Sequence, residues 1–328
     1  MKIVYFHWSK NNGPSITKSF RPFINKIAET ETVEEYYLPY RGASPLLIMR
    51  NILYVYKHRT KRGINHITGD IHYCVLGLIG CKSVLTIHDD YAMVTARKGI
   101  LDKIYKWLFW IYLPVKLADK VVCISESTKQ KIDKLVKNKN TEIITHHAFD
   151  NLHYTPKVFN RNCPIILQVG TDPQKNLEST IKALAGINCK LRVIGKMSKT
   201  QHLLAKSLEI DYSNVCDLSD EEIINEYTNA DIVVFPSLYE GLGMPILEGQ
   251  AIGRVVITSN ISPMNTVAGD GALLLKNPAN KQEYKTAVLK IISDECFRQN
   301  LIREGLKNVQ KYSVSEAVRK YMKIYNEL

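Results

Sequence analysis

Short apolar runs alternate with amphipathic stretches along the whole chain, which is typical of an α/β protein. After the first run, at residues 2–7, Phe20, Phe23 and Ile27 recur at the spacing of one helix face. Strands alternating with helices favour parallel sheets. The pattern predicts strands at residues 2–7, 35–38, 64–68, 83–88, 120–124, 142–146, 165–169, 190–194, 231–235, 255–258 and 272–275.

The chain of 328 residues is longer than the size at which a single hydrophobic core usually stops growing. Residues 149–164 are polar, contain two prolines and lack a sustained period, so we place a hinge there. The sequence therefore predicts two Rossmann-like domains, at residues 1–155 and 156–312, and a last helix at residues 313–328.

Two glutamates, Glu240 and Glu248, stand eight positions apart after the strand predicted at residues 231–235. A helix is expected to begin near Pro245, so Glu240 falls in the strand-to-helix loop and Glu248 about one turn into the helix. Glycines in this loop let the backbone approach a ligand, and the helix start offers N–H groups to an anion. Such a site suits a ligand with hydroxyls and phosphates, such as a nucleotide sugar. The alternative is a turn with two solvated glutamates.

The same block contains Phe-Pro-Ser, Tyr-Glu-Gly, Gly-Met-Pro and Ala-x-Gly in register between residues 235 and 253. It resembles the paired-glutamate motif of the retaining glycosyltransferases of family 4 (glycosyl transferases group 1). The resemblance implies the GT-B fold, in which two Rossmann-like domains face each other across a cleft. It also implies that Glu240 lies at the donor sugar and that Glu248 holds the nucleotide ribose. The backbone amides expected on sugar and phosphate belong to Gly241, Leu242 and Gly243.

The loop at residues 169–176 resembles the donor-diphosphate loop of this family, in which an arginine and a lysine neutralise the leaving group. Lys175 matches the lysine, and the alternative is an exposed lysine at a helix start. Gln174 and Thr171 stand where relatives carry the arginine. That departure leaves open weaker catalysis, another donor or a compensating basic residue. Gly170 and Thr171 are further donor-binding candidates, and Arg254 and Lys196 are the candidate compensating residues.

In the first domain, residues 86–89 resemble the Thr-x-His-Asp segment of the family, whose histidine lies beside the reacting sugar carbon. We therefore expect His88 to bond a sugar hydroxyl or to assist the acceptor, although a histidine at a strand end is often structural. Weaker candidates near the acceptor or the cleft are Gly13, Asp89 and Ser125, and a helix cap explains Ser125 equally well. In relatives the last helix crosses back onto the first domain.

The resemblance implies a hexosyltransferase that uses a nucleotide-diphosphate sugar (a UDP-sugar or GDP-mannose) and keeps the anomeric configuration. The acceptor is expected to be a hydroxyl of a glycan or lipid-linked molecule, and bacterial surface polysaccharide synthesis is suggested by analogy. No cofactor is expected, and no Asp-x-Asp motif for a divalent metal is present. Two alternatives stay open: a non-catalytic subunit that binds a nucleotide sugar, and an epimerase or hydrolase of nucleotide sugars on the same fold.

Lysine and arginine outnumber acidic residues by 44 to 32, a net charge of +12, which favours an anionic partner. From the charge alone, a nucleic-acid binder is a third alternative, but no recognition module is visible, so we expect no nucleic-acid partner. Lysines flank the aromatic residues of 107–112, and the hypothesis is that this helix rests on the inner membrane surface; the alternative is a core helix with solvated lysines. These lysines are Lys98, Lys103, Lys106 and Lys116.

The seven cysteines are scattered without paired spacing, and no signal peptide is visible at the N-terminus. The longest apolar run, residues 107–115, spans nine residues, whereas a membrane-spanning helix needs about 20. The sequence therefore predicts a cytoplasmic protein with free thiols, peripheral on the inner face of the membrane if the lysine-flanked helix binds there.

Overall fold

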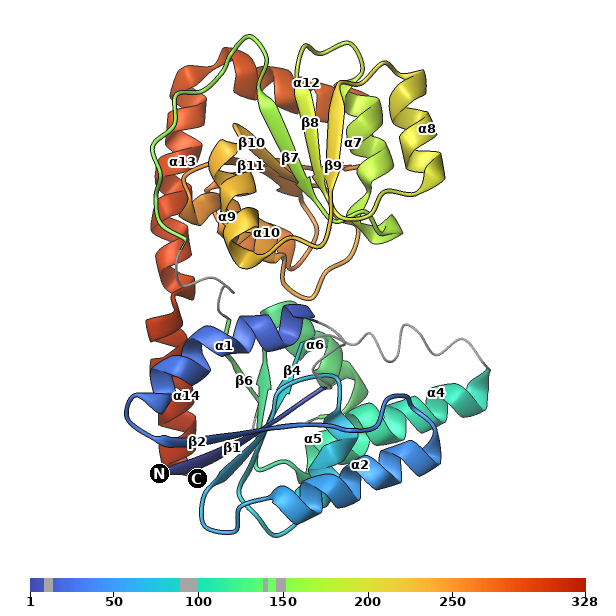
Figure 1. Ribbon diagram of the computed structural model, residues 1–328, viewed down its shortest axis with the longest axis vertical. Helices are drawn as coiled ribbons and strands as arrows, with labels where there is room; N and C mark the ends of the chain where they lie inside the picture. Colours follow the sequence, from blue (N-terminus) through green and yellow to red (C-terminus); the bar gives the residue numbers. More distant parts are fainter. Residues whose placement is uncertain (9–13, 89–98, 138–140, 146–151) are drawn as a thin grey trace. The chain divides into compact units, whose positions relative to one another are not determined.

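The computed structural model describes residues 1–8, 14–88, 99–137, 141–145 and 152–328 of the chain (Figure 1). The chain divides into two compact units. The first comprises Met1–Asp150 together with Ser313–Leu328, and the second comprises Asn151–Tyr312. The division at 150/151 falls inside the polar segment chosen as the hinge, five residues before the boundary expected from the sequence.

In the described part of the first unit, six parallel strands form one sheet in the order β2-β1-β3-β4-β5-β6. The central strands β1 and β4 are buried, as expected of a parallel sheet covered on both faces. The order changes direction between β1 and β3, so the loops after these strands flank a topological switch point. The strands are β1 (Lys2–His7), β2 (Thr32–Tyr37), β3 (Ile64–Ile67), β4 (Ser83–Ile87), β5 (Lys120–Cys123) and β6 (Thr141–Ile143).

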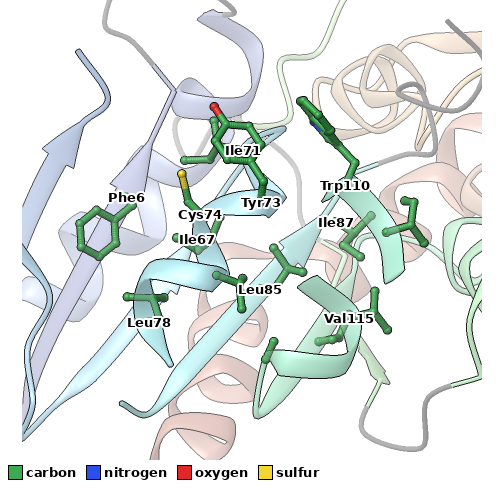
Figure 2. Packing of buried hydrophobic residues seen from close by; sticks show 14 of the residues in the cluster. Phe6, Ile67, Ile71, Tyr73, Cys74, Leu78, Leu85, Ile87, Trp110 and Val115 are labelled. Carbon is green, nitrogen blue, oxygen red and sulfur yellow. The ribbon is translucent and has the colours of Figure 1, made fainter. Parts of the chain in front are cut away.

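Helices cover this sheet and close its main core. Figure 2 shows Phe6, Ile67 and Leu85 from the strands packing with Tyr73 and other side chains of the neighbouring helices. These helices are α2 (Pro45–His58), η1 (His72–Leu78), α4 (Ile100–Lys106), η2 (Trp107–Tyr112), α5 (Leu113–Leu117) and α6 (Glu126–Leu135). The helix α1 (Pro14–Ala28) packs in a second core, with Ile3 and Tyr5 of β1.

The aromatic segment η2 packs inward. Trp110 is buried in the core of Figure 2, and Trp107 and Phe109 are partly buried against the same core. The structure thus favours the core-helix alternative over membrane contact for these rings. Of the flanking lysines, Lys106 lies 3.5 Å from Asp102, whereas Lys98 lies outside the described residues.

The last helix, α14 (Val314–Glu327), belongs to the first unit. Its apolar side packs with α1 and with Ile3 and Val122 of the sheet. A buried polar network completes the contact, because the Tyr325 hydroxyl lies 2.6 Å from Nδ1 of His66 and 3.1 Å from the Tyr5 hydroxyl. Buried hydroxyl groups are stable only with such partners.

Over residues 152–312, all of which are described, the second unit contains a parallel sheet in the order β12-β11-β10-β7-β8-β9. This is the doubly wound order of dinucleotide-binding folds, with its switch point between β7 and β10. The strands are β7 (Ile165–Val169), β8 (Lys190–Ile194), β9 (Tyr212–Val215), β10 (Ile232–Phe235), β11 (Val255–Ser259) and β12 (Ala272–Leu275). The helices are η3 (Pro173–Lys175), α7 (Leu177–Leu184), α8 (Lys199–Ser207), α9 (Asp220–Asn229), α10 (Met244–Ala251), α11 (Met264–Ala268), α12 (Lys281–Ser293), α13 (Glu295–Val309) and η4 (Gln310–Tyr312).

The sequence missed β9 and misplaced the ends of β2 and β6. All three are edge strands with half-exposed residues, so their apolar pattern is weak. The strands β7 and β8 occupy the predicted residues. No helix in the described residues combines the length and apolar character that crossing a bilayer requires.

Candidate active site

The loops that follow β7 and β10 meet at the switch point of the second sheet. The two strands are hydrogen-bonded neighbours, so their carboxyl ends lie at the same edge. The backbone N–H of Leu238 donates to the carbonyl of Gln174 at 2.8 Å, and Nζ of Lys175 lies 2.6 Å from Oε1 of Glu240. The lysine and the first glutamate predicted from the sequence therefore form an ion pair.

Lys175 is held by its surroundings. Gly170 has φ +92°, and a Cβ there would lie 2.8 Å from Cγ of Lys175, so glycine leaves room for the lysine stem. The ammonium group lies 4.8 Å from the centre of the Phe235 ring, within the range of a cation–π contact. The side-chain amide of Gln168 donates to the Lys175 carbonyl at 2.9 Å.

Asn176 stabilises the loop after β7 through hydrogen bonds of its side chain. It adopts the left-handed conformation at φ 59°, which asparagine tolerates better than most residues. Its amide donates to the carbonyls of Pro236 and Pro278, both at 3.2 Å. Asn176 therefore ties the loop after β7 to the loop after β10. The sequence pattern did not predict this role, although an asparagine directly after the candidate lysine was a usable signal.

Glu248 lies in α10, which begins after Gly243 and carries Pro245 in its first turn. The side chain is buried and accepts a hydrogen bond from the hydroxyl of Tyr227 in α9. Burial raises the pKa of Glu248 to about 7, although the Tyr227 hydrogen bond and the charge of Lys175 both lower it. A buried carboxyl group that titrates near neutrality marks a candidate functional residue.

Arg254 stabilises the backbone around this site. The guanidinium is buried and donates to the carbonyls of Tyr227 at 3.2 Å, Thr228 at 2.9 Å and Thr155 at 2.9 Å. It holds the end of the helix that carries Tyr227, so it is not available as the compensating cation considered from the sequence.

Thr171 and Lys196 are linked to each other. The Thr171 hydroxyl donates to the carbonyl of Lys196 at 2.8 Å, and Lys196 is exposed. The positions expected to carry the family's arginine thus hold neutral side chains, Thr171 and Gln174. Lys175 is the cation that these two loops bring to Glu240.

In the first unit, His88 follows β4. Its Nε2 lies 2.9 Å from the carbonyl of Thr68, which can only accept, so Nε2 carries the proton and Nδ1 is the acceptor of the neutral ring. Burial lowers the pKa of His88 to about 4, partly offset by the bond to Thr68, so the ring is neutral at pH 7. A neutral imidazole with an acceptor nitrogen can receive a hydrogen bond from a hydroxyl.

The remaining first-unit candidates have separate outcomes. Ser125 caps α6, because its hydroxyl accepts from the Thr128 N–H at 3.1 Å. Gly13 and Asp89 lie outside the described residues. His7 lies at the same edge of the sheet, since its Nδ1 is 2.9 Å from the hydroxyl of Thr68, the residue whose carbonyl contacts His88.

Within the described residues, no group of three or more histidine, cysteine, aspartate or glutamate side chains is arranged to hold a metal ion.

Residues 155–308, nearly all of the second unit, match the family model described as glycosyl transferases group 1. The second unit therefore contains the domain that defines this family. O-antigen chain mannosyltransferase B of Escherichia coli is 22% identical over 272 aligned positions, and the alignment covers 75% of this chain and 71% of that relative.

Solved structures share the fold over the full length of the glycosyltransferase. Sucrose-phosphate synthase from Thermosynechococcus elongatus superposes with a TM-score of 0.80 at 16% identity, covering 100% of this chain and 99% of the other. HepE of Anabaena in complex with UDP-glucose superposes with a TM-score of 0.76 at 15% identity, covering 100% of both chains. With the two parallel six-stranded sheets in the described residues, these matches confirm the GT-B fold expected from the sequence.

Proposed function

We propose that this glycosyltransferase is a retaining, metal-independent hexosyltransferase that takes its sugar from a nucleoside diphosphate. The ion pair of Lys175 and Glu240 beside the buried Glu248 carries the proposal, because it joins a cation for phosphate to carboxylates for hydroxyls at one sheet edge. The HepE structure with UDP-glucose supports a nucleotide-sugar donor. The O-antigen mannosyltransferase supports a glycan or lipid-linked acceptor in surface polysaccharide synthesis, which would place the protein on the cytoplasmic side of the membrane.

The proposed roles follow from charge. Lys175 and the N–H groups at the start of α10 stabilise the negative charge that develops on the departing diphosphate. Glu240 accepts hydrogen bonds from the sugar and stabilises its positive character. Glu248 accepts hydrogen bonds from the ribose hydroxyls, which requires its ionised form. His88 is the proposed acceptor-side residue of the first unit.

Retention needs no protein nucleophile under this proposal. The bond from the anomeric carbon to the diphosphate breaks while a bond to the acceptor oxygen forms on the same face. The acceptor proton passes to the departing phosphate oxygen. The protein contributes a preorganised electrostatic environment, which is commonly the largest part of catalysis.

The proposal is tested first by donor screening and then by turnover. A panel of UDP- and GDP-sugars is scanned for a rise in melting temperature, because a bound donor stabilises the folded state. The donor found is then incubated with an acceptor panel, using Glu240→Gln and the exposed control Glu221→Gln. We expect Glu240→Gln to lower turnover by about 10² while its melting temperature stays that of the control. Equal turnover of both variants would remove Glu240 from the mechanism.

One observation favours a second candidate, a non-catalytic subunit that binds a nucleotide sugar. Neutral Thr171 and Gln174 occupy the positions of the family's arginine, so the diphosphate has one cation fewer. The same assay separates the two candidates. A donor-dependent rise in melting temperature without release of nucleotide or formation of glycoside, across the acceptor panel, would favour the non-catalytic subunit.

A further inference from the structure

Helix α2 of the first unit, labelled in Figure 1, carries an exposed apolar stripe along one face. Its residues follow one another at intervals of three, four and three positions, so they share one side of the helix. Each side chain is more than half exposed, which is unusual for a contiguous apolar set on a monomer. The stripe consists of Leu46 (53%), Met49 (53%), Leu53 (52%) and Tyr56 (55%).

The opposite face of α2 is already occupied. Ile48 and Val55 are buried in the core of the first unit. The amide of Asn51 donates to the Tyr73 hydroxyl and to the Tyr40 carbonyl, both at 3.0 Å. These contacts fix the rotation of the helix, so the apolar stripe is held facing away from the core of its unit.

The surroundings of the stripe are basic. The sequence contains no aspartate or glutamate between Glu35 and Asp70. On the helix, Arg50 and Lys57 are exposed beside the stripe, and the Arg59 guanidinium lies 3.9 Å from the centre of the Tyr56 ring. The six basic residues of this segment are Arg41, Arg50, Lys57, Arg59, Lys61 and Arg62.

The short helix α4 extends the apolar surface. The Tyr105 hydroxyl donates to the Ala43 carbonyl at 3.0 Å, which places α4 next to the start of α2. The exposed fractions on α4 are 74% for Ile100, 79% for Leu101 and 53% for Ile104. Two helices of one unit therefore present apolar side chains in the same region.

We infer that α2, extended by α4, is a docking surface for a bilayer that contains anionic lipid. Exposed apolar side chains insert at the level of the headgroups, and cations beside them attract the anionic surface. A second copy of the chain fits less well, because a two-fold contact through this stripe would bring Arg50 and Lys57 towards their own counterparts without an acidic partner. The inference replaces η2, whose rings pack inward, as the membrane-contacting segment.

Vesicle flotation tests the inference without donor or acceptor, so its outcome is independent of the proposed transfer reaction. The full chain is mixed with vesicles of phosphatidylcholine alone or of phosphatidylcholine with phosphatidylglycerol. The α2 variants are Leu46→Gln with Leu53→Gln, and Arg50→Gln with Lys57→Gln. The matched controls are on α8, where the side chains are also exposed. Leu203→Gln is the control for the apolar substitutions, and the double variant Lys199→Gln with Lys206→Gln is the control for the basic ones.

We expect the wild-type chain and the α8 controls to float with the anionic vesicles and not with phosphatidylcholine alone. Each basic residue near an anionic surface contributes about fivefold to partitioning, so Arg50→Gln with Lys57→Gln should lower it by roughly 25-fold. The apolar pair of substitutions should lower it by about tenfold. Circular dichroism verifies the fold, since all four sites are exposed.

The inference is overturned if the wild-type chain fails to float with anionic vesicles. It is equally overturned if the α2 variants float like the α8 controls. Concentration-dependent dimerisation that disappears in Leu46→Gln with Leu53→Gln, without vesicle binding, would assign the stripe to a second copy of the chain instead.

Discussion

Ionisation of the buried Glu248 destabilises the folded protein, although the proposed contact with the donor uses the ionised carboxylate. Its folded-state pKa of about 7 exceeds its ordinary value of 4.5, so ionisation in the folded protein is unfavourable. The stability associated with the neutral form is complete below about pH 4.5 and is lost as the pH rises through about 7. The buried charge then lowers the unfolding free energy by about 3 kcal/mol. A ligand that donates hydrogen bonds to the carboxylate would recover part of this cost.

Glu248→Gln should therefore stabilise the unliganded protein, and only at higher pH. The amide keeps an acceptor for Tyr227 but cannot ionise. Urea unfolding at a series of pH values should give equal stabilities near pH 4, with the variant gaining up to about 3 kcal/mol as the pH passes about 7. A stability difference that does not change with pH would contradict the assignment of a raised pKa to Glu248.

Tyr227 is a positioning residue for Glu248, and Tyr227→Phe isolates that role. The lost hydrogen bond stabilised the carboxylate, so the pKa of Glu248 should rise further. Donor affinity, which needs the carboxylate, should then reach its half-maximal value at a pH higher by about one unit. Isothermal calorimetry with the donor across pH measures this shift. Tyr212→Phe on β9 is the control, and an unshifted profile in Tyr227→Phe would show that the hydroxyl acts only in packing.

Local signals in the sequence point to the residues of the candidate site but not to the residues that hold them in place. Glu240 lies in the loop after β10, Glu248 in the helix α10 that follows, and Lys175 in η3 after β7. Glycine, proline and a preceding apolar strand are local signals for all three positions. Tyr227 and Arg254 have no such signal, because Tyr227 contacts Glu248 from 21 positions away and Arg254 bonds carbonyls of another helix. Contacts of this kind depend on how helices pack, which the pattern of one segment does not specify.

At the scale of helices and strands, burial decided what could be predicted. The apolar run of β7 and the alternation of β8, which buries Leu191 and Val193, predict both strands to the residue, whereas the edge strand β9 has no buried residue and neither pattern. Burial also explains why the membrane contact was expected at η2 and not at α2. An aromatic run beside lysines looks like a membrane contact, yet its rings fill the core, and the exposed apolar stripe lies on α2 instead.

The helix α14 should be essential to the stability of the first unit. Tyr325→Phe leaves His66 and Tyr5 without their shared hydroxyl partner in a buried network. Unpaired buried polar groups cost about 1–3 kcal/mol, so the unfolding free energy should fall by that amount. Urea unfolding followed by circular dichroism measures it, with the exposed Tyr56→Phe as the control. Equal midpoints for both variants would mean that the network adds no net stability.

In both units, candidate site residues lie at the edge of the sheet where the strand order changes direction. Lys175 follows β7 and Glu240 follows β10, the two strands on either side of the switch point of the second sheet. His7 ends β1 and Thr68 follows β3, the strands flanking the switch point of the first sheet. Alternating strands and helices predicted both sheets, but the strand orders became visible only in the structure.

Steady-state turnover of Lys175→Ala, with saturating donor and acceptor, tests most directly whether the Lys175–Glu240 pair is the catalytic centre. The control is Lys182→Ala, an exposed lysine on α7. Loss of the cation that stabilises the leaving diphosphate should lower kcat by about 10²–10³, with an unchanged melting temperature. If Lys175→Ala turns over as fast as Lys182→Ala, the pair at the switch point does not drive the transfer.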